Sequence, residues 1–159
     1  MSRILVVTAD DFGLSRSTTA SILSTVDRGA VNAVSVIPNG SDVEYALAEW
    51  QKRKQHLSLA VHINLTEGKA LTEAARIPHL VDSSGAFCHS PFSLLFKTLF
   101  AIGTFREKIK EELSLEITAQ VNKVRTMAGA DVSLAINAHQ HVQMIPLVFE
   151  VVVMLHEAL

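Results

Sequence analysis

The chain has 159 residues, the size of one domain, so we expect residues 1–159 to form a single domain. Hydrophobic residues make up 48% of the chain and charged residues 19%, and the mean hydropathy is +0.28, which excludes an intrinsically disordered chain. The net charge is −2 and there is no basic block, so composition argues against nucleic-acid and anionic-membrane partners and favours a small-molecule ligand.

The first predicted elements form a strand, a helix and a second strand. Ile4–Val7 is a short β-branched apolar run, the pattern of a strand buried in a parallel sheet. Ser15 is placed to cap the start of a helix. Gly29 is expected to end this helix, because helices commonly end at a glycine in the left-handed conformation. Residues 32–37 then predict the second strand, which completes one β/α unit.

The pattern repeats in the next stretch. Ser41 and Glu44 predict a capping box at the start of a second helix, and residues 57–64 predict a third strand. Residues 65–103 lose regular periodicity, apart from a predicted short helix over 92–100. Loops of this length are usually functional, so we expect this excursion to contribute to a site.

The last third of the chain continues the alternation. Thr104 and Glu107 predict a capping box for a long helix ending near Gly129, residues 132–138 predict a fourth strand, and Pro146 opens a last helix. That helix has no stop signal before the end of the sequence, so we expect the chain to be truncated before its fold closes.

Alternating strands and helices predict an α/β fold with parallel strands, either an open doubly wound sheet or part of a (β/α) barrel. A complete eight-stranded barrel takes about 250 residues. Four predicted strands cannot close one, so a barrel here would be incomplete.

Polar residues with metal-binding or catalytic potential follow three of the predicted strands. In parallel α/β folds, the carboxyl ends of the strands converge on one edge, where sites are built. The three clusters are Asp10 with Asp11, His62 with Asn64, and His139 with His141.

One carboxylate and two imidazoles from these clusters would make a metal site with open positions for water and substrate. A bend at residues 12–13 would let both Asp10 and Asp11 reach that site, with the second carboxylate acting as a general base. The structural alternatives are an aspartate that caps the following turn and histidines that are simply hydrogen-bonded in the sheet.

Other chemistry finds less support in the sequence. Cys88 is the only cysteine, so no intrachain disulfide can form, and it has no neighbouring base to activate it as a nucleophile. His79 and His89 lie in the excursion, either lining a cleft or on loop surface. No apolar run is long enough for a membrane helix, and the start lacks a signal-peptide pattern, so we expect a cytoplasmic protein.

Three motifs together resemble the YdjC-like carbohydrate deacetylases, which include the chitooligosaccharide deacetylases. The motifs are Thr8-Ala9-Asp10-Asp11-Phe12-Gly13-Leu14-Ser15, His62-x-Asn64-Leu65-Thr66-x-Gly68 and His139-Gln140-His141-Val142-x-x-x-Pro146. Their order and spacing also match, and the resemblance spans essentially the whole chain.

The resemblance implies an irregular (β/α) barrel and a metal-dependent enzyme that releases acetate from N-acetylated amino sugars. Asp11, His62 and His139 would bind a divalent metal, Mg²⁺ or Zn²⁺, and Asp10 would be the general base. The implied partner is a small carbohydrate substrate. Asn64 and His141 are further candidates to support a ligand or to contact substrate.

This sequence departs from the family pattern at three places. The family's general acid is a histidine in a C-terminal segment, expected beyond Leu159. Asn137 stands where the family usually has an aspartate, and Gln143 where it often has a further histidine. Asn137 would be a neutral support for a ligand histidine in place of a charged one, so metal affinity or rate would be lower.

Two other functions remain open at this point. One is a metal- or sugar-binding remnant without catalysis, which the departures from the family pattern favour. The other is a metal-dependent phosphoesterase, against which the lack of arginine or lysine beside the motifs counts. A partial barrel would also expose strand edges and apolar helix faces, so we expect self-association into a homo-oligomer.

Overall fold

The computed structural model describes residues 5–158, without the side chains of residues 156–158. The chain forms two compact units. Among the described residues, the sheet unit comprises 5–62 and 123–137, and the helical unit comprises 63–122 and 138–158. The expectation of one domain stays a prediction.

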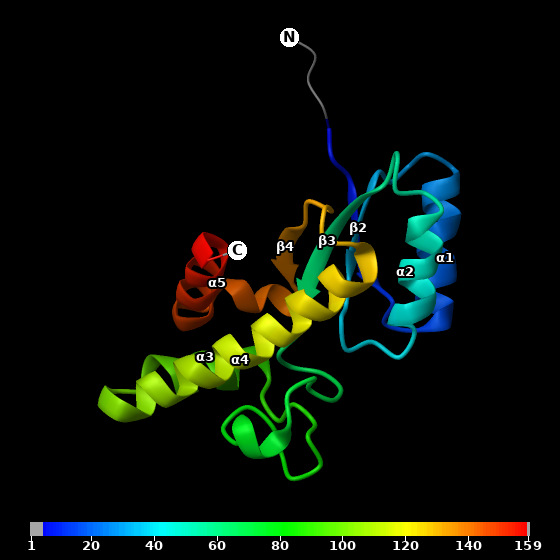
Figure 1. Ribbon diagram of the computed structural model, residues 1–159. Coiled ribbons are helices and arrows are strands. Elements are labelled where there is room, and N and C mark those ends of the chain that lie inside the picture. Colours follow the sequence, from blue (N-terminus) through cyan, green and yellow to red (C-terminus); the bar gives the residue numbers. More distant parts are fainter. Residues whose placement is uncertain (1–4, 159) are drawn as a thin grey trace. The chain divides into compact units, whose positions relative to one another are not determined.

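Four strands form one sheet in the order β1-β2-β3-β4 (Figure 1). Parallel pairing joins β1 to β2 and β2 to β3. Parallel strands connected by helices confirm the predicted α/β class, and the sheet among the described residues is open, as an incomplete barrel requires. The strands are β1 (Thr8–Phe12), β2 (Ala33–Val36), β3 (Ser58–Ile63) and β4 (Ala135–Ala138).

Helices α1 (Arg16–Asp27) and α2 (Val43–Gln51) lie side by side along the sheet in the sheet unit (Figure 1). The predicted cap of α1 is confirmed, because the Ser15 hydroxyl accepts the Thr18 N–H at 3.2 Å. Gly29 follows α1 with a φ of 73°, the left-handed conformation expected there. Both helices bury their predicted apolar faces: Ile22, Leu23 and Val26 in α1, and Val43, Ala46, Leu47 and Trp50 in α2.

Two predictions for the sheet unit are wrong. The first strand is Thr8–Phe12 and not residues 4–7, of which Ile4 lies outside the described residues. Pairing starts where β2 offers a partner, so Thr8 lies opposite the first residue of β2, while the Val7 N–H bonds the side chain of Asn32. The capping box at the start of α2 is also absent, because the Ser41 hydroxyl donates to a carbonyl in the loop after β1 instead.

A close backbone contact fixes the loop that follows β1. The Gly13 carbonyl accepts the Asp42 N–H at 3.0 Å, and a Cβ at Gly40 would lie 2.2 Å from the Gly13 oxygen. Only glycine fits at position 40, and Gly13 itself has a φ of +86°. The turn directly after Asp10 and Asp11 is therefore tied to the turn after β2.

The helical unit contains helices α3 and α5 and most of helix α4. The predicted short helix is confirmed as α3 (Pro91–Leu99), and the last helix, α5 (Pro146–Ala158), begins at the predicted proline. Helix α4 (Gly103–Ala128), whose last six residues belong to the sheet unit, starts one residue before Thr104, so Thr104 is not its cap. The predicted apolar stripe of α4 is fully buried: Ile109, Leu113, Ile117, Val121 and Val124.

Residues 65–102 pack on α4 through buried carboxylates. Glu116, which is 0% exposed, accepts the backbone N–H groups of Leu71 and Thr72 at 3.1 and 2.8 Å. Glu112, one turn earlier, accepts the backbone N–H of His79 at 2.9 Å. Charge-assisted hydrogen bonds to backbone donors are strong, so they give the irregular part of residues 65–102 a defined path. This part includes the 3-10 helix η1 (Ala74–Arg76).

Candidate metal centre

Asp10 and Asp11 lie in β1 at a shift in its pairing with β2. Two residues of β1 oppose the single residue Ser35 of β2, and Asp11 has a left-handed φ of 63°. This bulge breaks the two-residue alternation that would send the neighbouring carboxylates to opposite faces. Both reach His62: Asp10 Oδ1 lies 3.9 Å from Nδ1, and Asp11 Oδ1 lies 3.3 Å from Nε2. The strand already bends at Asp11, and the expected turn at residues 12–13 follows at Gly13, which has a φ of 86°.

Hydrogen bonds fix the ring of His62, which is buried near the end of β3. Asn137 Nδ2 donates to Asp10 Oδ1 at 2.9 Å, and because a carboxylate only accepts, this contact sets the orientation of the amide. Asn137 Oδ1 then faces His62 Nδ1 at 2.7 Å and also accepts the Ser35 hydroxyl. Nδ1 of His62 therefore donates to Asn137 Oδ1, and Nε2 faces Asp11.

The facing atoms of Asp11 and His62 fit a bound metal ion. Nε2 of a neutral imidazole and a carboxylate oxygen both present lone pairs, here 3.3 Å apart. Two ligands at ~2.1 Å from a tetrahedral Zn²⁺ lie about 3.4 Å from one another. The donor set and its spacing therefore suit a divalent cation, and a cation between the two atoms would relieve their repulsion.

Asn64 organises the turn that follows β3. Its side-chain oxygen accepts the N–H groups of Thr66 and Glu67, each at 3.1 Å, and its amide donates to the Glu67 carbonyl at 2.9 Å. Gln120 of α4 binds both backbone groups of Asn64, accepting its N–H at 2.9 Å and donating to its carbonyl at 2.7 Å. These contacts position Glu67, and a substrate role for Asn64 stays a prediction.

The two histidines of the third motif differ in their surroundings. The 3-10 helix η2 (His139–Met144) begins directly after β4, with positive φ at Gln140 and His141. The strand alternation that would place the histidines on one face therefore ends at His139. His139 is largely buried, with Nε2 3.5 Å from a Glu67 carboxylate oxygen, whereas His141 is exposed. A supporting role for His141 stays a prediction.

Asp11 and His62 of the sheet unit each present a potential ligand atom, and His139 of the helical unit is the third member of the expected donor set. Sequence reasoning proposed this donor set but missed Ser35, Glu67 and Gln120. Ser35 looked like an ordinary strand residue, and Glu67 occupies the variable position of its motif. The signal for Gln120 was present, since it follows Glu112 and Glu116 at four-residue intervals along one side of α4.

The family is shown by comparison with known proteins. The family model described as YdjC-like protein matches residues 4–158. This chain belongs to the YdjC-like family.

Curated relatives agree with this membership. The chitooligosaccharide deacetylases of Yersinia enterocolitica (serotype O:8 / biotype 1B) and Escherichia fergusonii are each 30% identical to this chain over 152 residues. Each match covers 96% of this chain and 55% of the relative, so the chain spans about half the length of these curated relatives.

One solved structure shares the fold. It is the crystal structure of a proposed cellobiose-phosphate cleavage protein from Enterococcus faecalis V583, with a TM-score of 0.77 and 24% sequence identity. The match covers 96% of this chain and 55% of that protein. At this identity the likeness supports the fold alone.

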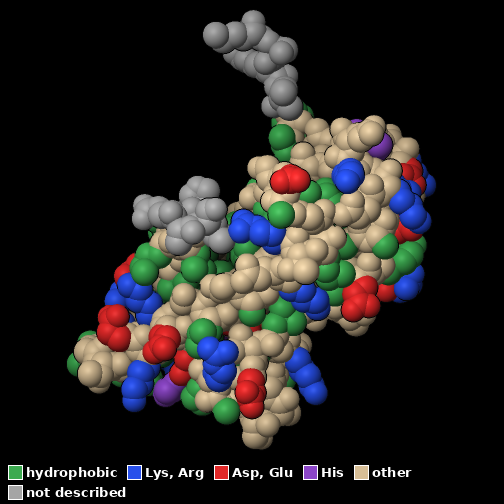
Figure 2. All heavy atoms as spheres, in the orientation of Figure 1, with side chains coloured by type: hydrophobic (Ala, Val, Ile, Leu, Met, Phe, Trp, Pro, Cys, Tyr) green, Lys and Arg blue, Asp and Glu red, His purple; other side chains and the backbone are tan. Residues whose placement is uncertain are grey.

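The surface agrees with the composition. Basic and acidic side chains are mixed over the face shown in Figure 2, without a broad area of one sign. Among the described residues, no helix has both the length and the apolar character needed to cross a membrane.

Proposed function

We propose that this chain acts as a metal-dependent carbohydrate N-deacetylase that releases acetate from N-acetylated amino sugars or chitooligosaccharides. The observation that carries the proposal is the arrangement around His62, with Asp11 facing Nε2 and Asp10 held by the amide that orients the same ring. Family membership and the names of the curated relatives support the same chemistry.

Asp11, His62 and His139 are the proposed ligands of a divalent cation, Mg²⁺ or Zn²⁺. Asp11 and His62 already lie at ligand spacing, and His139 follows Asn137, the partner of His62, by two residues, a span of at most about 7 Å. When bound, the cation would polarise the acetamide carbonyl and make its water more acidic.

Asp10 is the proposed general base. Asp10 is exposed, so water and substrate can reach it. Asn137 Nδ2 donates a hydrogen bond of 2.9 Å to Asp10 Oδ1 and so orients the carboxylate. In the proposed reaction Asp10 takes a proton from water as the water oxygen bonds to the acetyl carbon. The C–N bond then breaks and the nitrogen takes up one proton, which balances the proton that Asp10 removed from water, so acetate and the free amine of the sugar leave.

Acetate release and metal content test this proposal together. Metal-free protein reloaded with Mg²⁺ or Zn²⁺ should release acetate from N,N′-diacetylchitobiose. Asp10→Asn should keep the metal and lower the rate by about 10²-fold or more, whereas Asp11→Asn should lose metal. Asp131→Asn, an exposed aspartate of the sheet unit, is the matched control and should change neither.

The outcomes separate the other candidate functions. Metal and sugar binding with no acetate release from any loaded form would favour a non-catalytic remnant and refute the proposal. Hydrolysis of a generic phosphate ester at a rate above that of acetate release would favour a phosphoesterase.

Self-association and a cytoplasmic location remain part of the proposal. Support for self-association comes from large apolar side chains exposed on α3 and α5, which sedimentation of the purified protein would test. They include Phe92 (75% exposed), Phe96 (56%) and Phe149 (56%).

A further inference from the structure

Six large apolar side chains along residues 92–105 of the helical unit are exposed. Those in α3 recur three or four residues apart, so they share one face of this helix, whereas Leu94 and Thr98 on the opposite face are buried. We call these six side chains the α3 stripe: Phe92 (75% exposed), Phe96 (56%), Leu99 (60%), Phe100 (74%), Ile102 (80%) and Phe105 (40%).

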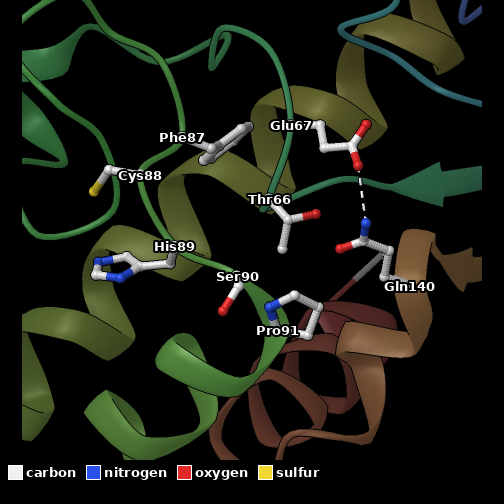
Figure 3. Close-up of a pocket in the computed structure, with 8 residues that line it drawn as sticks. All are labelled: Thr66, Glu67, Phe87, Cys88, His89, Ser90, Pro91 and Gln140. Carbon is white, nitrogen blue, oxygen red and sulfur yellow. Dashed lines mark hydrogen bonds between the residues drawn. The ribbon is translucent and has the colours of Figure 1, made fainter.

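Contacts within the helical unit hold α3 with this face outward. At the start of the helix the Ser90 hydroxyl accepts the Ser93 N–H at 3.2 Å, and Pro91 occupies the first helical position. Figure 3 shows Ser90 and Pro91 where the chain enters the helix. Further along, Lys97 Nζ donates to the His79 carbonyl at 2.6 Å. The α3 stripe is therefore a fixed part of the surface of this unit.

The α3 stripe lies in a stretch of the chain with little charge. No aspartate or glutamate occurs from residue 83 to residue 106, and the basic residues of this stretch are Lys97 and Arg106. Both are engaged within the same copy, because Lys97 bonds to the His79 carbonyl and Arg106 Nη2 donates to Glu150 at 2.7 Å. Two copies of the stripe can therefore face each other without bringing unpaired like charges together.

The α3 stripe is large enough for one side of a dimer interface. A large apolar side chain has about 200 Å² of surface, so the exposed fractions leave roughly 700 Å² of the stripe accessible. The largest apolar patch on a typical monomer covers about 300–600 Å², and a standard protein–protein interface buries about 800 Å² on each partner. The stripe therefore exceeds an ordinary surface patch and nearly matches one side of an interface.

We propose that the α3 stripe is the contact with a second copy of this chain, in which two α3 helices pack about a two-fold axis. The proposal rests on the self-association in the proposed function and deepens it by naming the surface that pairs. A two-fold contact places one residue of each copy against its own counterpart at the axis. Phe96 is the middle one of the three exposed phenylalanines of α3, and its ring stacks on Phe100 with centroids 6.2 Å apart. In the proposed dimer the two Phe96 rings meet at the axis.

Sedimentation velocity of the full chain over a range of protein concentrations tests the contact. The parent should sediment as a dimer. Phe96→Glu should raise the dimer dissociation constant at least about 100-fold, because it places two carboxylates together at the axis. Phe149→Glu is the matched control, since Phe149 of α5 is also 56% exposed, and it should leave the dissociation constant unchanged. Circular dichroism confirms that both variants are folded.

Disulfide cross-linking tests the symmetry of the contact. Cys88→Ser removes the only cysteine, and Phe96→Cys in this background should form a covalent dimer when diamide oxidises the two thiols. Phe149→Cys in the same background is the control and should form little covalent dimer.

Several results would overturn the α3 contact. They are a parent that stays monomeric at every concentration, a folded Phe96→Glu that dimerises like the parent, or equal cross-linking through both cysteines. A dimer that dissociates in Phe149→Glu and not in Phe96→Glu would keep self-association and refute its placement on α3. A monomer that binds phosphatidylcholine vesicles, and loses this binding in Phe96→Glu, would assign the stripe to a lipid surface and refute the second copy. None of these measurements involves metal or acetate, so their failure is distinct from failure of the deacetylase proposal.

Discussion

The two units hold their candidate site residues by different means. In the sheet unit, side chains bond to side chains: Asn137 joins His62 to Asp10 through one amide. In the helical unit, side chains of α4 bond to backbone, as when Glu116 captures two N–H groups of the excursion. The first arrangement fixes chemical groups relative to one another, whereas the second fixes the path of a loop. The difference separates side chains of the candidate metal centre from side chains that hold a loop on α4.

The largest expected effect comes from removing the Glu116 carboxylate, which holds residues 71 and 72 on α4. Glu116→Ala leaves the part-buried N–H groups of Leu71 and Thr72 without their carboxylate acceptor, so we expect a loss of about 3 kcal/mol in the free energy of unfolding. Denaturant unfolding measures this loss. Hydrogen exchange should show faster exchange at these two amides and little change in β2 or β3.

Glu111→Ala is the matched control, because it shortens an exposed glutamate on the same helix. Its stability should stay within about 0.5 kcal/mol of the parent. Equal destabilisation by both variants would show that Glu116 acts through helix propensity, and the contrast between the two units would lose its basis.

Local chemistry explains what the sequence predicted well. The Ser15 cap, the apolar face of α4 and the Pro146 helix start depend on residues within one or two turns of each other. The position of β1 was wrong because apolar character does not specify where a strand finds its partner. Residues 4–7 are more apolar than the polar strand that actually pairs with β2.

From the sequence, the candidate metal centre could be predicted only as a set of metal-ligating residues, without its geometry. Parallel topology made it reasonable to group Asp11, His62 and His139, but the bulge that turns Asp11 depends on the register between two strands. The pair formed by Glu67 and His139 joins residues 72 positions apart, and no periodicity in the sequence marks it. Long-range pairings of this kind appear only when the fold is known.

The next effect in size tests the network of the sheet unit. Asn137→Ala removes the acceptor of His62 Nδ1 and the donor to Asp10, so the ring can rotate or change tautomer. We expect metal affinity to fall about 10- to 100-fold, measured by calorimetry, and the ¹⁵N shifts of His62 in metal-free protein to change.

Asn137→Asp separates orientation from charge. It keeps an acceptor for His62 but places a second carboxylate where Asp10 now receives a hydrogen bond, so metal affinity should recover more than acetate release. Asn122→Ala, at an exposed asparagine of α4, is the control and should not alter metal binding. Unchanged affinity in Asn137→Ala would mean that packing and the Ser35 hydroxyl, 3.3 Å from Nδ1, are enough to orient His62.

The smallest expected effect concerns a half-exposed ion pair in the helical unit. Hydrogen bonds from Lys110 and then Arg106, each at 2.7 Å, lower the pKa of Glu150 from its ordinary value of 4.5. A carboxyl group with a lowered pKa in the folded state stabilises the fold above its unfolded pKa, and that stability is lost as pH falls through the folded value. Glu150→Gln should therefore lower Tm by less than about 2 °C near neutral pH, because ion pairs near the surface contribute little.

The Tm difference between Glu150→Gln and the parent should shrink as pH falls below 4.5. Circular dichroism measures it, with Glu111→Gln as the control. A difference that stays constant into acid would show that the carboxylate charge of Glu150 contributes nothing to joining α4 and α5.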